Sequence, residues 1–282
     1  MIDNPTPACP AAFGQEPPPA MERRDVLRVR DGAAAPGEDM LADEVPVALV
    51  YNGISHAVMM ATPSDLEDFA LGFSLTEALI DHPGECYGID IEAGGAGVAV
   101  HLDVASRAFM ALKERRRSLA GRTGCGLCGV DSLDQVYRTL PGRRSDAVLT
   151  GAAVRAALAA LPGRQALNGV TGATHAAAWC DLAGNLAVVR EDVGRHNALD
   201  KVVGALARDP ALRAVDGFAL VTSRVSVEMV QKAAMAGAAG IVGVSAPTAT
   251  AVRMAEGAGM VLLAFARGDR FTCYAGRERL VP

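Results

Sequence analysis

The chain has 282 residues and a mass of 29.1 kDa, enough for one large domain or two modest ones. Half of the residues are hydrophobic but only 4% are aromatic, which argues against a disordered chain and against a stacking platform for single-stranded nucleic acid. Its 27 basic and 32 acidic residues give a net charge of -5, so a general duplex-DNA binder is not expected.

Six cysteines are present, and only Cys125 and Cys128 stand close together. The N-terminus lacks the apolar segment that a signal peptide needs, so we expect neither secretion nor a framework of disulfides. An uncharged run at 233–252 is interrupted by Ser245, Pro247 and Thr248. We therefore expect a helix, a strand and a turn there rather than a membrane span.

The first half of the chain is predicted to form a small N-terminal α+β domain at 25–120, after a loose tail at 1–24. Asn52-Gly53 is a tight-turn signal for a hairpin, and Thr62 followed by Pro63 predicts the start of a helix with Thr62 as its N-cap. The elements expected here are strands at 24–30, 44–51 and 56–60, a helix from Thr62 to about Leu79, strands at 87–92 and 98–104, and a helix at 107–119.

A glycine-rich stretch at 121–129 is predicted to be a mobile loop that leads into a second domain at 130–282. Strands alternate with helices in this second part, which is typical of an α/β layer with a partly parallel sheet. The elements expected are a helix at 150–161, strands at 174–180 and 186–190, a helix at 194–208 capped by Asp192, a strand at 218–222, a helix at 225–238, a strand at 240–244, a helix at 248–257 and a final strand at 260–266.

Cys125 and Cys128 form the sharpest local motif. Two thiols three residues apart can share a metal, close a disulfide or pass a sulfur atom. A structural zinc needs two further ligands at similar spacing, and the sequence offers none, so no metal site is expected. Flanking glycines favour a mobile loop, and the arginines at 115–117 and 122 favour the thiolate form. Two incidental cysteines in a turn, beside a solvated arginine face, are the alternative.

Three polar motifs, at 191–201, 222–232 and 245–250, each follow a predicted strand and precede a helix. Such junctions are the places where α/β folds bind ligands, because helix starts hold anions. The apolar stripe of the 194–208 helix puts its polar group on the face away from the core, and Arg224 is suited to hold a phosphate. The motifs predict a binding edge for a phosphate-rich nucleotide; a surface salt-bridge cluster and ordinary N-caps are the alternatives.

Together these motifs closely resemble the FdhD family of formate dehydrogenase accessory sulfurtransferases. The resemblance runs from about Glu44 to Tyr274 and keeps the order of the family's motifs. The segments that carry it are Pro46, Asn52-Gly53, Thr62-Pro63, Gly72-Phe73, Thr76-Glu77, 123–129, Thr171-Gly172, Thr174-His175, 191–201, 223–228, 246–248 and 265–267.

The resemblance implies a cytoplasmic sulfur carrier. Such a carrier takes sulfur from a cysteine desulfurase and passes it to the molybdenum or tungsten bis-guanine-dinucleotide cofactor, Mo-bis(molybdopterin guanine dinucleotide), before insertion into formate dehydrogenase. The family's persulfide cysteine maps onto Cys125, with Cys128 assisting. The family's cofactor-binding segment maps onto Phe265, Ala266, Arg267, Gly268, Asp269 and Arg270. From the two helix-start motifs we expect further contacts by Arg195, His196, Asn197, Lys201, Ser223, Arg224 and Ser226.

The family's fold implies a cytidine-deaminase-like main domain beside the smaller N-terminal α+β domain, within the α/β class. Deaminase chemistry is not expected, because Ala198, Ser223 and Ser226 stand where a zinc deaminase has its general-base Glu and its thiolate ligands. We expect a homodimer with no nucleic-acid or membrane partner. Two alternatives remain: a chaperone that delivers the cofactor without moving sulfur, and a metal-binding or redox protein that uses the cysteine pair.

Overall fold

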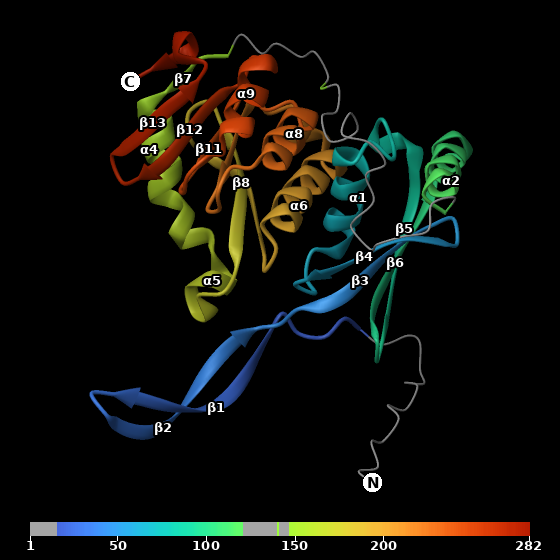
Figure 1. Ribbon diagram of the computed structural model, residues 1–282, viewed down its shortest axis with the longest axis horizontal. Helices are drawn as coiled ribbons and strands as arrows, with labels where there is room; N and C mark the ends of the chain where they lie inside the picture. The colour runs from blue at the N-terminus through green and yellow to red at the C-terminus, as the bar shows by residue number, and fades with distance from the viewer. Residues whose placement is uncertain (1–15, 121–139, 141–146) are drawn as a thin grey trace.

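The computed structural model describes residues 16–120, 140 and 147–282, and it shows two sheets with helices packed between them (Figure 1). The layers follow one another as helix α4, a six-stranded sheet, helices α6, α8 and α9, helix α1, and a four-stranded sheet. The mixed α/β class is confirmed. The likeness to cytidine deaminases and the division into domains stay predictions.

The four-stranded sheet has the order β4–β3–β6–β5. Its hairpin turn is the predicted one, because Asn52 and Gly53 both have positive φ, at 45° and 81°. Tyr51 and Phe69 are fully buried between this sheet and α1. The elements are β3 (Val45–Tyr51), β4 (Ile54–Ala61), α1 (Leu66–Thr76), η1 (Pro83–Glu85), β5 (Cys86–Gly94), β6 (Gly97–Val104) and α2 (Ser106–Ala120).

The predicted start of helix α1 is wrong. The helix begins at Leu66 behind Asp65, a left-handed N-cap residue with φ 52° and no side-chain cap. Thr62 is instead used in a tertiary contact: its Oγ1 accepts from the Val193 amide at 3.1 Å, and its own amide donates to Asp192 at 3.0 Å. The cap residue predicted from local sequence therefore joins the two halves of the chain.

The six-stranded sheet has the order β13–β12–β11–β10–β8–β9, and the middle strands β10, β11 and β12 are parallel. Because β8 is antiparallel to both β9 and β10, β9 runs in the same direction as β10, β11 and β12. The partly parallel sheet is thus confirmed. Its strands are β8 (His175–Asp181), β9 (Leu186–Asp192), β10 (Gly217–Val221), β11 (Gly240–Gly243), β12 (Val261–Arg267) and β13 (Arg270–Ala275).

Helices cover both faces of this sheet. One face packs against α6, α8 and α9, and the other against α4 and the turn that follows it. The N-caps of α4 and α9 are Thr150 and Thr248, whose hydroxyls accept from Ala153 and Ala251. The remaining elements are β7 (Leu149–Thr150), α4 (Gly151–Ala160), η2 (Leu161–Arg164), α5 (Ala166–Thr171), α6 (Arg195–Arg208), α7 (Pro210–Arg213), α8 (Val227–Met235), α9 (Ala249–Gly257), η3 (Arg277–Arg279) and β14 (Leu280–Val281).

Helices α1 and α6 cross at two glycines. A Cβ on Gly72 would lie 1.7 Å from the Asp200 carbonyl oxygen, and one on Gly204 would lie 1.8 Å from that of Asp68. Any side chain at either position would therefore push the helices apart. This close crossing fixes the four-stranded sheet against the α6 side of the larger one.

Several boundaries differ from the sequence-based expectation. β1 (Met21–Arg30) begins within the predicted tail, and β2 (Ala33–Ala42) was not predicted. β2 contains Pro36 and Gly37, two residues that are uncommon inside strands. β13 follows the strand predicted to be the last, and α8 is shorter than expected. Gly194, not Asp192, is the N-cap of α6. Among the helices described, none is long and apolar enough to cross a membrane.

Candidate functional site

The candidate site lies at the carboxyl edge of the six-stranded sheet. Strands β9, β10 and β11 end there, and each leads directly into the start of α6, α8 or α9. The N-cap residues of these helices are Gly194, Ser226 and Thr248. The prediction that the three polar motifs meet at one edge of one sheet is confirmed. Three helix starts at one edge favour an anionic ligand.

The loops at this edge are joined by main-chain hydrogen bonds. The Val225 amide donates to Ala246 and the Thr248 amide to Val225, both at 3.0 Å, so the loops after β10 and β11 pair with each other. The Phe265 amide donates to Ser245 at 3.1 Å, and the Arg267 Nε donates to the Val244 carbonyl at 3.3 Å. The end of β12 is thereby held against the same loops.

The Phe265–Arg270 segment is the far end of the β12–β13 hairpin. The register shifts between Ala264 and Arg267, where Phe265 has a positive φ of 51° and is 47% exposed as a residue. A left-handed conformation is costly for a bulky aromatic residue, and such strain is common at ligand sites. Ala266 is buried, while Arg267, Gly268, Asp269 and Arg270 are exposed. The edge thus presents an aromatic ring beside two guanidinium groups.

Arg195 and His196 open helix α6 and keep unused hydrogen-bonding atoms. Arg195 Nε and His196 Nε2 are buried and have no partner within the described residues. Burial and then the charges of Arg195 and Lys232 lower the pKa of His196 to about 4, against the opposite effect of Glu228 and Glu77. The imidazole is therefore neutral at pH 7 and can donate to, or accept from, a ligand group.

The next turn of α6 is not a free polar face, and the prediction that it points away from the core is wrong. Lys201 is fully buried, and its Nζ lies 2.7 Å from the equally buried Asp192 carboxylate. The same Nζ donates to the carbonyls of Thr62 and Glu191. Asn197 is also buried and donates to the Met60 carbonyl and to Asp192. Packing of α1 and the β4–α1 link over this side of α6 buries these groups.

A second buried ion pair involves Asp200, which directly precedes Lys201 on α6. Lys232 of α8 contacts both carboxylate oxygens of Asp200 at 2.9 Å and also reaches Glu77 at 3.0 Å. Thr76, at the end of α1, donates to Asp200 at 2.6 Å and accepts from Lys232. These bonds join α1, α6 and α8 directly behind His196. They hold the start of α6 in place from the four-stranded side.

The loop after β10 contributes one exposed, one buried and one half-buried residue of the predicted site. Arg224 is exposed, whereas Ser223 is buried and donates to the Arg224 carbonyl at 3.0 Å. Ser226 is the N-cap residue of α8 and is half-buried. Of the predicted contact residues, Arg224, Phe265, Arg267, Gly268, Asp269 and Arg270 are exposed, Arg195, His196 and Ser226 are half-buried, and Asn197, Lys201, Ser223 and Ala266 are buried.

Two residues of the sequence motifs, His175 and Glu191, were not among the predicted contact residues, although they belong to the same edge. Burial, followed by the charge of Arg195, lowers the pKa of His175. Glu191 accepts from the amides of Leu167 and Asn168 and from the Thr174 hydroxyl, and so ties α5 to the sheet. His175 lies in the motif at 171–175 and Glu191 opens the motif at 191–201, but nothing in the sequence showed that the two motifs lie side by side.

Cys125 and Cys128 lie outside the described residues, so their position relative to this edge is a matter for proposal. Across residues 16–120, 140 and 147–282, no group of three or more His, Cys, Asp or Glu side chains is placed to hold a metal ion.

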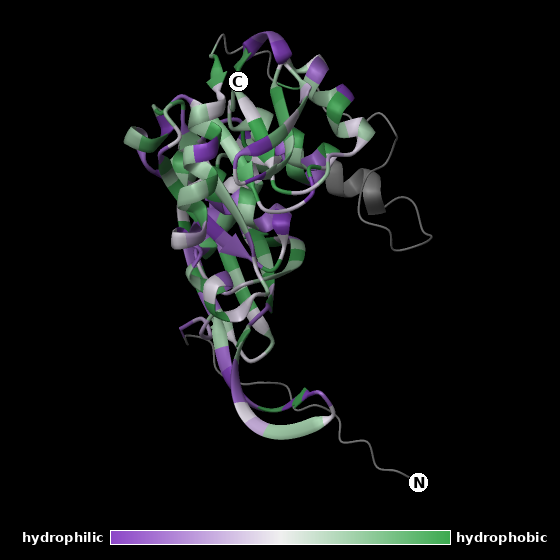
Figure 2. Ribbon diagram, turned by 90° about the vertical axis from the view of Figure 1, so that its left-hand side faces the viewer, coloured by the Kyte–Doolittle hydropathy of each residue, from purple (hydrophilic) through white to green (hydrophobic). Residues whose placement is uncertain are grey.

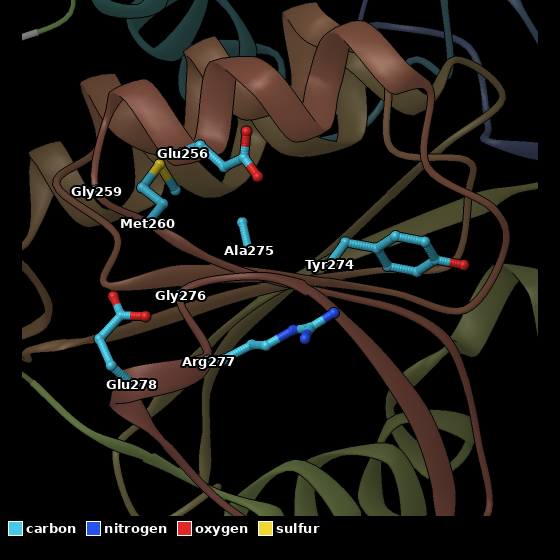
Figure 3. A pocket seen from close by; sticks show the side chains of 8 residues that line it. All are labelled: Glu256, Gly259, Met260, Tyr274, Ala275, Gly276, Arg277 and Glu278. Atoms are coloured by element: carbon cyan, nitrogen blue, oxygen red, sulfur yellow. The ribbon is translucent and has the colours of Figure 1, made fainter.

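A surface pocket of about 390 Å³ lies at the opposite, amino end of β12, lined by Glu256, Met260, Tyr274 and Arg277 among others (Figure 3). It contains none of the predicted site residues.

Comparison with known proteins identifies the family. The sequence model described as FdhD/NarQ family matches residues 42–281. The chain belongs to the FdhD/NarQ family. A relative from Cupriavidus necator, named sulfur carrier protein FdhD, is 54% identical over 96% of this chain and 94% of its own. Relatives of the same name from Bordetella petrii and Variovorax paradoxus are each 51% identical, over 93% of this chain and 96% and 94% of their own.

A solved structure has the same overall fold. It is a protein of Desulfotalea psychrophila, proposed to be a formate dehydrogenase accessory protein, and it superposes with a TM-score of 0.72. The match covers 93% of this chain and all of the other at 23% sequence identity. The family resemblance found in the motifs of the sequence is confirmed by the family model and the curated relatives, and the solved structure shows that the fold is shared.

Proposed function

We propose that this protein is a cytoplasmic sulfur carrier that serves formate dehydrogenase. The observation that carries the proposal is sequence identity to proteins named sulfur carriers. It amounts to about half of all aligned positions and extends over nearly the whole chain. The thiols of Cys125 and Cys128 match that role, because a carrier needs a nucleophilic sulfur and a means of releasing what it holds. The donor is a cysteine desulfurase.

Loading is a thiol exchange. The Cys125 thiolate attacks the outer sulfur of the donor's persulfide, a new S–S bond forms, and the donor cysteine leaves as a thiolate. Release as sulfide consumes two electrons. Cys128 supplies them when its thiolate attacks the Cys125 sulfur, forms the Cys125–Cys128 disulfide and expels hydrosulfide, after which a cellular dithiol reduces the disulfide. This scheme makes Cys125 essential and Cys128 replaceable in part by an external thiol.

The acceptor is the molybdenum or tungsten bis-guanine-dinucleotide cofactor, which is cargo rather than a resident group. Its diphosphates suit the sheet edge, since three helix starts and the guanidinium groups of Arg195 and Arg224 favour anions there. The unpartnered Nε of Arg195 and Nε2 of His196 suit a ligand that offers several polar atoms. The exposed Phe265 ring offers a flat surface on which a guanine base stacks.

A maturation assay tests the function. In cells that lack their own copy of the gene, the wild-type protein should restore formate dehydrogenase activity and Cys125→Ala should not. Cys128→Ala should restore the activity in part. Cys86→Ala changes a cysteine of β5, outside the Cys125–Cys128 motif, and is the matched control that should restore full activity. The alternative, a chaperone that delivers the cofactor without moving sulfur, predicts full activity for all three variants.

A further inference from the structure

Lys232 of α8 lies at the centre of a buried polar cluster between α1, α6 and α8. Much of the ribbon in the body of the molecule is coloured as hydrophobic in Figure 2, so a charge buried there needs partners of its own. Lys232 is 5% exposed, and Asp200, its main partner, is 1% exposed. The ammonium contacts both Asp200 oxygens at 2.9 Å, and Glu77 and the Thr76 hydroxyl at 3.0 Å each. Its N–H groups are thus fully used by these acceptors, and Lys232 can affect a ligand only through other residues.

The Lys232 ammonium stays charged in spite of its burial. Burial lowers the pKa of Lys232, but the charges of Asp200 and Glu77 and their hydrogen bonds outweigh this effect and raise it above the usual value. The Nζ atom also lies 5.5 Å from the centre of the Phe73 ring, a favourable cation–π contact. Because little solvent screens this buried charge, it acts strongly on neighbouring groups.

The cluster lies one helical turn behind the binding edge. Asp200 follows His196 by one turn on α6, and Lys232 follows Glu228 by one turn on α8. His196 and Glu228 belong to the first turns of these helices, whose starts open on the edge. The contacts of Lys232 with Asp200 and with Thr76 therefore fix both helix starts against the end of α1.

The charged groups around His196 come from all three helices. They are Arg195 and, one turn further on, Asp200 of α6, Lys232 and Glu228 of α8, and Glu77 of α1. After burial, the charges of Arg195 and Lys232 lower the pKa of His196 to about 4, and the two glutamates oppose them. Loss of Lys232 would remove one cation and would also leave the Glu77 carboxylate without this partner. Both changes favour the imidazolium form, so Lys232 affects the charge of His196 in two ways.

We propose that Lys232 is a positioning residue for the ligand contact of His196: it holds the first turns of α6 and α8 against α1, and its contacts with Asp200 and Glu77 let His196 meet the ligand as a neutral group. This role rests on the proposed binding of a guanine dinucleotide at the edge. A neutral imidazole donates one hydrogen bond and accepts another, so it distinguishes among polar ligand atoms, whereas an imidazolium attracts any anion. Lys232 thereby favours the nucleotide over free phosphate.

Binding of guanosine diphosphate to Lys232→Met, measured between about pH 8 and about pH 6, tests the proposal. At the higher pH the variant should bind more weakly than wild type, because α6 and α8 lose a contact and the edge loses a nearby positive charge. Towards the lower pH His196 takes up a proton in the variant only, so this deficit should shrink about fivefold if the bound phosphates raise the imidazole pKa by about one unit. Wild type supplies the pH dependence of the nucleotide itself, and an added His196→Gln change should abolish the shrinkage.

A second variant keeps the test independent of folding. Lys232→Met leaves Asp200 buried without its partner and is expected to lose stability, whereas Lys232→Met with Asp200→Asn replaces the buried ion pair by neutral groups. Proton NMR of the His196 ring should give a pKa at least about one unit higher in both variants than the value of about 4 in wild type. Lys113→Met is the matched control and should change neither measurement, because Lys113 also lies over an aromatic ring, 4.4 Å from the centre of Phe109, but on α2 (Figure 1).

A failure of this role is distinguishable from a failure of the proposed cargo site. Wild-type protein that binds guanosine diphosphate, together with a Lys232→Met deficit that is the same at both pH values, would overturn the role of Lys232 and leave the cargo site standing. A His196 pKa that both variants leave unchanged would also overturn it. Wild-type protein that does not bind guanosine diphosphate would contradict the cargo site, and with it the ligand contact of His196.

Discussion

Replacing Lys201 by Met should lower the free energy of unfolding of the protein rather than remove a direct ligand contact. Lys201 was expected to contact the cofactor, but its ammonium group is fully buried against Asp192 at 2.7 Å. Removing one partner of a buried ion pair typically costs about 3–5 kcal/mol, because the remaining charge is left without compensation. Lys201→Met also leaves the carbonyls of Thr62 and Glu191 without this donor.

The cost should fall near the lower end of that range, at about 3 kcal/mol. Asp192 would keep three donors: the amides of Thr62 and Gly194 and the Asn197 side chain, at 2.8–3.0 Å. These hydrogen bonds partly compensate the carboxylate charge. Because the two residues act together, Lys201→Met with Asp192→Asn should lose less stability than the sum of the single variants.

Urea unfolding followed by the fluorescence of Trp179, the single tryptophan, gives the measurement. Arg23→Met is the control, because the Arg23–Glu38 pair is exposed at 70% and 61%, and its loss should leave the transition almost unchanged. A loss below about 1 kcal/mol for Lys201→Met, together with abolished nucleotide binding, would refute the structural role argued here.

Three further outcomes are expected. Guanosine diphosphate at a hundred times its dissociation constant should add about 2.7 kcal/mol to the free energy of unfolding and raise the melting temperature by roughly 5–10 °C. Arg224→Ala should reduce this rise, whereas Arg253→Ala, an exposed change on α9, should leave it unchanged. Gly204→Ala should prevent stable folding, since its Cβ would lie 1.8 Å from the Asp68 carbonyl, whereas Gly257→Ala meets nothing within 4 Å and should be neutral or slightly stabilising in denaturant titrations. The free energy of unfolding should fall as pH falls from about 6.5 towards 4, because in this range His196 binds a proton in the unfolded chain but not in the folded protein, where its pKa is about 4. His196→Gln should flatten this dependence of stability on pH. An unchanged dependence would assign it to other groups such as His175.

The sequence was most informative where local signals agree with the surrounding fold. Asn52-Gly53 specified its hairpin, and Thr150 and Thr248 begin helices as N-caps do. The order of strands and helices from 174 to 266 predicted the partly parallel sheet and hence the shared edge of the three motifs. These features depend on neighbours within a few residues, or on the general rule that strand ends in α/β sheets meet.

The sequence was least informative where distant segments cover each other. The helical pattern of α6 correctly identified one buried stripe, but α1 buries a second side, so Asn197, Asp200 and Lys201 lie inside the molecule. Thr62 resembled an N-cap until its partners proved to be Val193 and Asp192, about 130 residues away. Contacts of this range leave no periodic signal in one sequence.

The most direct test of the sulfur-carrier proposal is mass mapping after incubation with a cysteine desulfurase and cysteine. The wild-type chain should gain the mass of one sulfur atom, and the peptide that carries it should contain Cys125. Cys128→Ala should gain the same mass, and Cys125→Ala should gain none. A sulfur adduct that forms equally in Cys125→Ala, or a wild-type chain that never gains one, would contradict the proposal and favour a cofactor chaperone.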